Sequence, residues 1–332
     1  MNKLFADMHC DTITTLYDKI QEGRKIQESS KKPEGSGDTL RVSGLQLDLE
    51  KLNASHYALQ NFAIFLDKEK YSNLYEEAMK RIAFFKEEVA KNTDLINQVT
   101  SYKEILDNCS KGHISALLTL EGGEILEGKT ENLHRFHKEG VRMITLTWNY
   151  PNELGYSHFD KMGNGLTKKG FEMVEAMEDL HMIPDVSHGS DTLFYDVCKV
   201  TRKPFVASHS NARNIYNHSR NMSDDMIKTL ANRGGVIGLN FYSGFVSAKC
   251  QAEGICYMKD MVAHALHIIK TGGVECLGLG SDFDGIDTDV EWKDASGMMQ
   301  FADALKKAGL SEGDCDKIVR DNVLRVYKDC LE

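Results

Sequence analysis

Two short apolar runs in the middle of the chain each end in Ser-His. They are Ile183-Pro-Asp-Val-Ser-His188 and Pro204-Phe-Val-Ala-Ser-His209. The polar segment between them is long enough for one helix, a pattern typical of a βαβ unit. Because parallel strands point the same way, His188 and His209 are expected side by side at the carboxyl edge of a sheet. Imidazoles held there favour a transition-metal site, although each histidine could instead cap its strand through a backbone hydrogen bond.

The rest of the chain repeats this alternation of apolar runs and helical segments. Eight strands are predicted, at about 4–10, 57–66, 114–120, 141–147, 183–187, 205–208, 235–240 and 276–281. Eight strands separated by helices predict an α/β fold, a (β/α)₈ TIM barrel of the metal-dependent hydrolase type. We expect residues 1–332 to form one domain with a polar loop insertion at about 21–39, which is either a lid over the site or a disordered insertion.

Composition limits the partners and the compartment. A net charge of -10 argues against nucleic acid and against an anionic membrane surface, and leaves small molecules as the expected partners. The eight cysteines are scattered without CxxC pairs, which favours a reducing compartment. The first residues enter an apolar run directly, so no secretory leader is expected, and no apolar run approaches membrane-spanning length. We predict a cytoplasmic protein.

Acidic and histidine side chains follow several other predicted strands. His9 and Asp11 share one face of the first strand, because strand side chains alternate. Glu121 directly follows a very apolar run and is either exposed at the strand end or bound to a cation. Asp282 follows the eighth strand. Independent surface residues would not all fall at the same barrel rim, so a metal site is favoured for the set.

Five candidate ligands are too many for one tetrahedral ion that must keep an open position. They suit two ions that share a bridging carboxylate, for which Glu121 is the natural choice because it lies between the two pairs in chain order. Two Zn²⁺ ions with a bridging water or hydroxide would supply a nucleophile near neutral pH and polarise a carbonyl. Hydrolysis is therefore the expected reaction.

Together these motifs resemble the membrane (renal) dipeptidase family, the M19 metallopeptidases, along nearly the whole chain. The motifs are Asp7-Met-His9-Cys-Asp11, Glu121-Gly-Gly, Asp185-Val-Ser-His188-Gly-Ser, Pro204-Phe-Val-Ala-Ser-His209-Ser-Asn-Ala-Arg213, Arg220-Asn221 and Gly280-Ser-Asp282-Phe-Asp-Gly285.

The resemblance implies that His9 and Asp11 bind one zinc, that His188 and His209 bind the other, and that Glu121 bridges them and belongs to the catalytic set. It implies that Arg220 binds the free carboxylate of a dipeptide and that Asp282 contacts substrate and passes a proton to the leaving amine. An arginine fork suits a carboxylate, and an aspartate can carry that proton. The resemblance also suggests a homodimer.

One position departs from the family. Mammalian members follow the fourth strand's Thr-Leu-Thr with a substrate-contacting histidine, where this chain has Trp148. An indole donates one hydrogen bond but cannot become an imidazolium, so we expect Trp148 to line the substrate pocket and to alter the range of dipeptides accepted. Two alternatives to a dipeptidase are hydrolysis of N-acyl amino acids or lactones on the same metals, and a metal-loaded binding protein without turnover.

Overall fold

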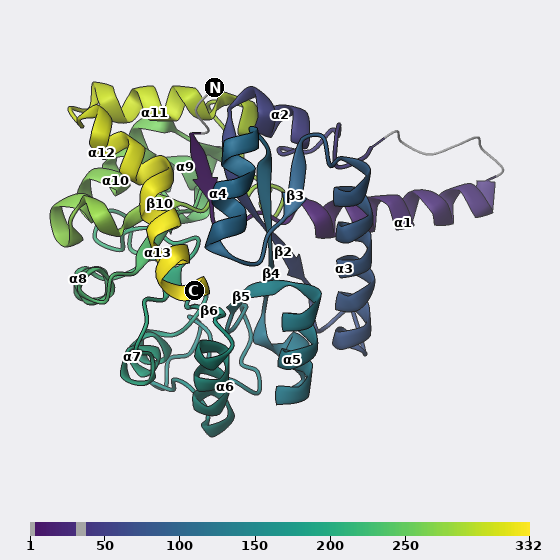
Figure 1. The fold of residues 1–332 in the computed structure, drawn as a ribbon. Coiled ribbons are helices and arrows are strands. Elements are labelled where there is room, and N and C mark those ends of the chain that lie inside the picture. The colour runs from purple at the N-terminus through teal and green to yellow at the C-terminus, as the bar shows by residue number, and fades with distance from the viewer. Residues whose placement is uncertain (1–3, 31–37) are drawn as a thin grey trace.

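The computed structural model describes residues 4–30 and 38–332, and a closed parallel barrel forms its centre (Figure 1). The barrel strands are β1 (Phe5–Asp7), β2 (Tyr57–Phe65), β4 (Ile114–Glu121), β5 (Val141–Thr145), β6 (Ile183–Asp185), β7 (Val206–Ala207), β8 (Val236–Leu239) and β10 (Leu277–Leu279). They pair in the order β2-β1-β10-β8-β7-β6-β5-β4, and β4 pairs back onto β2 from Leu59↔Ser115 to Phe65↔Glu121. The predicted (β/α)₈ barrel is confirmed, with all eight strands inside their expected ranges or within one residue of them.

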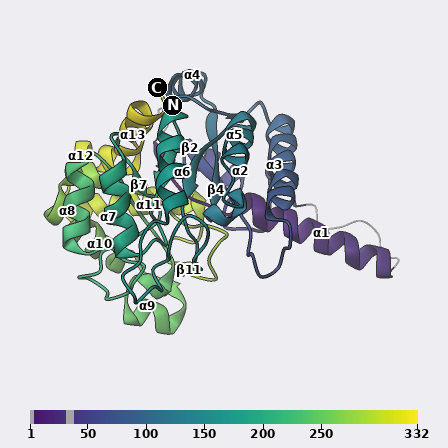
Figure 2. The ribbon, with the colours of Figure 1, turned by 90° about the horizontal axis from the view of Figure 1, so that it is seen from below.

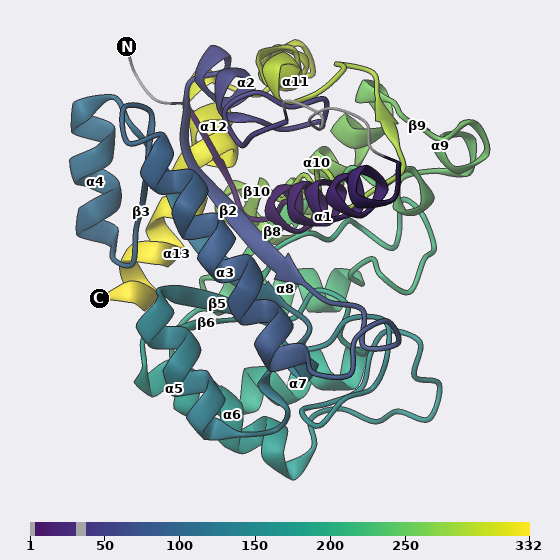
Figure 3. The same ribbon diagram turned by 90° about the vertical axis from the view of Figure 1, so that its right-hand side faces the viewer.

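Helices surround the strands on the outside of the barrel (Figures 1 and 3). They are α1 (Thr12–Ser30), α2 (Leu49–Ala54), α3 (Leu74–Lys91), α4 (Tyr102–Lys111), α5 (Thr130–Glu139), α6 (Lys168–Asp179), α7 (Asp191–Val200), α8 (Asp224–Asn232), α9 (Ala248–Glu253), α10 (Met258–Gly272), α11 (Met298–Lys307), α12 (Glu312–Asp316) and α13 (Asn322–Leu331). Their starts follow side-chain signals in the sequence. Ser101 and Glu104 form a reciprocal capping box at α4, and Ser223 caps α8 as its sequence predicts.

Three short strands complete the sheets. β3 (Ile96–Gln98) adds to the barrel alongside β4, and β9 (Ile255–Cys256) pairs with β11 (Asp289–Val290). None of the three was predicted, because runs of two or three residues are too short to show a period.

The prediction of a loop at about 21–39 is wrong for its first part. Residues 21–30 continue α1, which extends beyond the body of the protein in Figures 1 and 2. This segment is rich in Gln, Glu, Lys and Arg, which are good helix formers, so a polar composition did not mean an irregular chain. Residues 31–37 of the expected loop lie outside the described residues.

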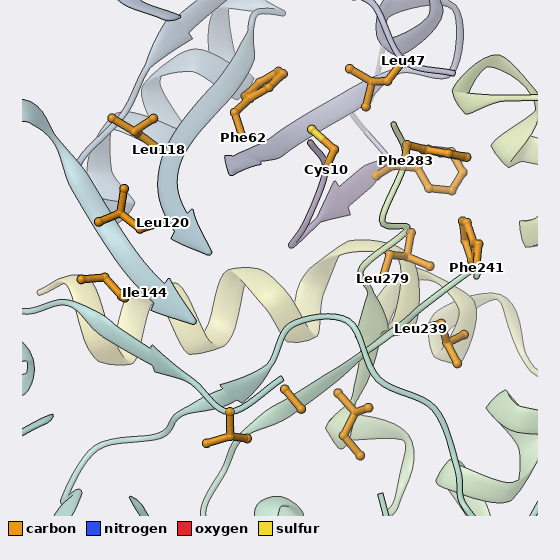
Figure 4. Close-up of a cluster of buried hydrophobic side chains, with 14 of the residues drawn as sticks. Cys10, Leu47, Phe62, Leu118, Leu120, Ile144, Leu239, Phe241, Leu279 and Phe283 are labelled. Carbon is orange, nitrogen blue, oxygen red and sulfur yellow. The ribbon is translucent and has the colours of Figure 1, made fainter. Parts of the chain in front are cut away.

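Two apolar clusters hold the barrel. Consecutive strand residues belong to different clusters: Leu117 and Met143 face the barrel interior, whereas Leu118 and Ile144 face the helices. Figure 4 shows part of the outer cluster, including Leu118 and Ile144. α13 packs against the inner cluster, and the Tyr327 hydroxyl accepts a hydrogen bond of 2.6 Å from Asn61 Nδ2. The barrel interior is therefore packed with side chains, which leaves the carboxyl ends of the strands for polar groups.

Candidate metal centre and substrate pocket

Five barrel strands bring acidic and histidine side chains together at one rim. His9 and Asp11 follow β1, Glu121 ends β4, His188 follows β6, His209 follows β7, and Asp282 follows β10. All six are buried. His9, Glu121 and His209 form one group with donor atoms within 4.8 Å of one another, and His9, Asp11 and Asp282 form another. The residues predicted from separate strands thus converge in space.

Glu121 lies between the two pairs. Its Oε1 is 3.1 Å from His188 Nε2 and 3.5 Å from His209 Nε2, and its Oε2 is 3.4 Å from His9 Nε2. A carboxylate with one oxygen toward each pair has the placement of a bridging ligand.

The other half of the centre gathers negative charge around His9. His9 Nε2 is 3.3 Å from Asp11 Oδ2 and 3.6 Å from Asp282 Oδ1. Burial acts to lower the pKa of His9, but the facing carboxylates of Glu121 and Asp11 outweigh it and raise that pKa well above its ordinary value. Asp11 Oδ1 is buried and has no hydrogen-bond partner among the described residues. A bound cation would therefore stabilise these buried carboxylate groups.

Neighbouring side chains fix which nitrogen of each later histidine carries hydrogen. His188 Nδ1 lies 2.9 Å from Asn149 Oδ1, which can only accept, so Nδ1 is the protonated nitrogen. The Ser208 hydroxyl donates to Asp185 Oδ2 at 2.6 Å, so it accepts from His209 Nδ1 at 2.7 Å. In both rings Nε2 is therefore unprotonated and keeps a lone pair that can bind a metal ion.

These two lone pairs face each other, with 3.0 Å between His188 Nε2 and His209 Nε2. Burial lowers the pKa of His188 to about 4 and the pKa of His209 well below its ordinary value, so both rings are neutral at pH 7. Two lone pairs and the Glu121 carboxylate at such distances repel one another, and a cation between them would turn the repulsion into coordination. The donor set therefore fits metal ions, with imidazole and carboxylate ligands that suit zinc.

Asp282 is the carboxyl group best placed to exchange a proton. Burial raises the pKa of Asp282 to about 8, and the Asp11 and Glu121 carboxylates add to this rise. Asn240 Nδ2 donates to Asp282 Oδ2 at 2.9 Å, which leaves Oδ1 facing the centre. Both Asp282 and His188 have a left-handed backbone, with φ of 64° and 66°, a strained conformation common at functional sites.

Arg220 is a buried cation without an anionic partner. Its Nη2 donates to the His209 carbonyl at 3.1 Å, and its guanidinium lies 5.2 Å from the ring centre of Phe245. No carboxylate lies within ion-pair distance of it among the described residues, and its buried Nε has no hydrogen-bond partner there. Burial lowers the pKa of Arg220 to about 10, so it is charged at pH 7. An unpaired buried guanidinium suits an anionic ligand.

A cavity of about 400 Å³ opens onto the centre. Asp11, Glu121, His188 and Asp282 line its polar side, and Phe65, Trp148, Tyr242 and Phe245 contribute aromatic walls. Trp148 packs on Phe65 with ring centres 4.7 Å apart and lies 6.3 Å from the His188 ring. Arg220 does not line this cavity. It lines a small adjoining one that shares His188.

Sequence reasoning missed the residues that support the ligands. The sequence analysis assigns no role to Asp185, Ser208 or Asn240, although each lies at or directly after the carboxyl end of a barrel strand. Asn149 lies in the loop after β5 that also carries Trp148. His158 lies in a polar loop, and no spacing or strand end marks it.

The chain is similar to several known proteins. The family model for membrane dipeptidases (peptidase family M19) matches residues 2–331. An uncharacterised dipeptidase of Schizosaccharomyces pombe is 30% identical over 300 residues, which is 85% of this chain and 71% of that protein. An uncharacterised protein from the pqqA 5' region of Klebsiella pneumoniae is 29% identical over 256 residues, which is 75% of this chain and 94% of that protein.

Two solved structures share the fold over the whole chain. One is the dipeptidase AC, a metallopeptidase of family M19, with a TM-score of 0.86, 22% identity and 99% of both chains covered. The other is a Rhodobacter sphaeroides metallopeptidase bound to a phosphinate mimic of L-Ala-D-Ala, with a TM-score of 0.86, 22% identity, and 99% of this chain and 100% of that chain covered.

Proposed function

Since the chain belongs to the membrane dipeptidase family, peptidase family M19, and is a metallodipeptidase, we propose that it hydrolyses dipeptides with a free carboxyl end using two zinc ions. The observation that carries the proposal is the set of facing lone pairs and carboxylates, with His188 Nε2 3.0 Å from His209 Nε2 and Glu121 between them and His9.

His9 and Asp11 would hold one zinc, His188 and His209 the other, and Glu121 would bridge them. Bound zinc would lower the pKa of a water molecule and polarise the peptide carbonyl. The protein's part is to keep the ligands rigid and correctly protonated. Asn149 and Ser208 do so for the two later histidines.

Arg220 would bind the substrate carboxylate. It is buried, charged and unpaired, and it lies beside the aromatic wall of the cavity through its contact with Phe245. A dipeptide carboxylate would supply the missing anion and would set the distance from the chain end to the scissile bond. Such an anchor would favour dipeptides over longer peptides.

Asp282 would move the proton. Oδ2 is fixed by Asn240, so Oδ1 receives the proton that the attacking water loses and passes it to the leaving nitrogen. Bound zinc would lower the pKa of Asp282, so its role in this transfer rests on the position of Oδ1, which faces the centre 3.6 Å from His9 Nε2.

The substrate range is proposed to include dipeptides with a D-residue in the second position. The Rhodobacter sphaeroides relative in fold is liganded with a mimic of L-Ala-D-Ala, and the open aromatic wall around Trp148 leaves room for different side chains. Trp148 would shape this range in place of the family histidine.

The protein is also proposed to work as a homodimer in a reducing compartment, the cytoplasm. All eight cysteines are free in the structure, which fits a reducing environment. Among the described residues, no helix is both long enough and apolar enough to cross a membrane. Size-exclusion chromatography with light scattering tests the dimer.

A substrate panel tests the activity. We expect L,L and L,D dipeptides to be cleaved by the zinc-loaded protein, the activity to disappear with a chelator, and zinc to restore it. A dipeptide amide, which lacks the carboxylate, is the matched control substrate and should be cleaved poorly. Cleavage of N-acyl amino acids or lactones alone would support the other hydrolase activity. Zinc binding without turnover of any substrate would support a binding protein.

A further inference from the structure

His158 is a buried histidine outside every motif that the proposed function uses. It lies in the segment between β5 and α6, and its backbone N–H donates to the His188 carbonyl at 2.7 Å. The preceding residue, Ser157, pairs with Gly189 in an isolated antiparallel bridge. The loop that carries His158 is thus fastened directly onto the turn that carries a metal-ligand candidate.

The His158 ring reaches the same turn a second time, through Asn149. His158 Nε2 lies 3.1 Å from Asn149 Oδ1, and His188 Nδ1 lies 2.9 Å from that oxygen. A carbonyl oxygen accepts but does not donate, so both ring nitrogens carry hydrogen and donate to it. One oxygen of Asn149 thus accepts a hydrogen bond from each of the two rings.

The other side of the His158 ring faces the turn before Arg220. With hydrogen on Nε2, the neutral ring accepts at Nδ1, where the Ser219 hydroxyl lies 2.8 Å away. The Ser219 hydroxyl can donate to Nδ1 while Nε2–H donates to Asn149, so the two contacts of the ring fit its neutral form. An ordered chain of hydrogen bonds thus runs from Ser219 through His158 and Asn149 to His188.

We propose that His158 is a positioning residue that holds Asn149 with its oxygen toward His188, and so keeps His188 Nε2 free to bind metal. If Asn149 turned its NH₂ group toward His188, the ring would take up hydrogen on Nε2 and could not be a ligand. Two donors to one oxygen favour the productive orientation over the reversed one. This inference rests on the proposed metal centre but not on any particular substrate.

The test is zinc affinity measured by competition with a chelator, without substrate. His158→Phe keeps a ring but removes both nitrogens, and we expect it to weaken binding of the zinc held by His188 and His209 by roughly 10- to 100-fold. His158→Gln keeps an N–H donor toward Asn149 and should restore most of that affinity. A role confined to packing would predict the reverse order, since phenylalanine fills the space better.

The chain offers a matched control at the other end of the barrel. His113 precedes β4, on the side away from Glu121, and its Nδ1 lies 2.9 Å from Asn97 Nδ2. His113→Phe breaks a comparable histidine–asparagine contact and should leave both zinc affinities unchanged. Should His158→Phe fail to fold, Ser219→Ala removes only the hydroxyl at Nδ1 and should weaken the same zinc by about two- to tenfold.

Wild-type zinc affinity in the folded His158→Phe variant, or in Ser219→Ala if the first does not fold, would overturn the inference. So would a His158→Gln variant that binds zinc no better than His158→Phe. A protein that binds two zinc ions with this pattern of affinities, but cleaves no dipeptide, would contradict the proposed function and leave the role of His158 intact.

Discussion

Gly285 is an exposed residue at which one methyl group should disable the metal centre without disturbing the fold. It follows Asp284 in the turn after β10. A Cβ atom built on it would lie 2.2 Å from Asp11 Oδ2 and 2.8 Å from Asp282 Oδ1. The methyl group of Gly285→Ala would therefore clash with a carboxylate oxygen of Asp11 and with one of Asp282.

The size of the effect follows from these distances. Non-bonded heavy atoms are at their optimum about 3.5 Å apart or more, so Asp11 Oδ2 must move by more than about 1 Å. The obstructing atoms are the ends of side chains that can rotate without moving the backbone, so relieving the clash should lower the free energy of unfolding by no more than about 1 kcal/mol. A displacement of about 1 Å at a reacting centre costs on the order of 100-fold in rate.

We expect Gly285→Ala to stay folded with a urea midpoint close to that of the wild type, and to lose the zinc held by His9 and Asp11 on dialysis. With zinc in excess, its kcat/KM for a dipeptide should be about 100-fold lower. Zinc content by elemental analysis and initial rates measure the two losses. Gly313→Ala is the matched control, because nothing lies within 4 Å of a Cβ atom there. Full zinc content and full activity in Gly285→Ala would refute the placement of Asp11 at the metal centre.

Three further variants test other parts of the site. Arg220→Met removes two charge-assisted hydrogen bonds to the substrate carboxylate, each worth about 1.5–3 kcal/mol, so kcat/KM for a dipeptide should fall roughly 10²- to 10⁴-fold. The slow cleavage of the dipeptide amide should be unchanged. An equal loss on both substrates would contradict carboxylate binding. Trp148→His should change the ranking of dipeptides by kcat/KM, and an unchanged ranking would show that the indole does not contact substrate. Burial raises the pKa of Glu124 from 4.5 to about 7, so its carboxyl group holds a proton more tightly in the folded protein than in the unfolded chain. The free energy of unfolding therefore decreases as the pH rises from about 4.5 to 7. In urea unfolding at pH 8, Glu124→Gln should therefore be more stable than the wild type by up to about 3 kcal/mol, and near pH 4 the two should be equally stable. The same difference in stability at both pH values would refute the raised pKa of Glu124.

The barrel could be predicted because its strands are buried on both faces. Leu117 and Leu118 are consecutive, yet one packs inside the barrel and the other against helices, so the strand appears as an unbroken apolar run. Such runs, with helical segments between them, give eight strands and hence the architecture. β3 has three residues and α1 continues through a polar segment, and neither leaves a distinct pattern in the sequence.

The convergence of the predicted ligands has the same origin. Parallel strands end at one rim, so a residue directly after a strand is placed there whatever the sequence separation. His9, Glu121 and His209 are each more than 85 residues apart along the chain, but their donor atoms lie within 4.8 Å of one another. Knowing where the strands end was enough to bring these three together.

The orientation of the ligands could not be predicted in this way. Each histidine needs a partner that decides which nitrogen carries hydrogen, and that partner can come from any chain segment that passes within about 3 Å. His209 takes its partner from the adjacent Ser208, which a strand end would place, whereas the contacts that hold Asn149 against His188 include His158, in an irregular loop. Loop paths follow from tertiary packing and not from a period in the sequence. For this reason the metal-ligand candidates follow from the strand pattern, while loop residues such as His158, which hold a ligand in its orientation, are visible only in three dimensions.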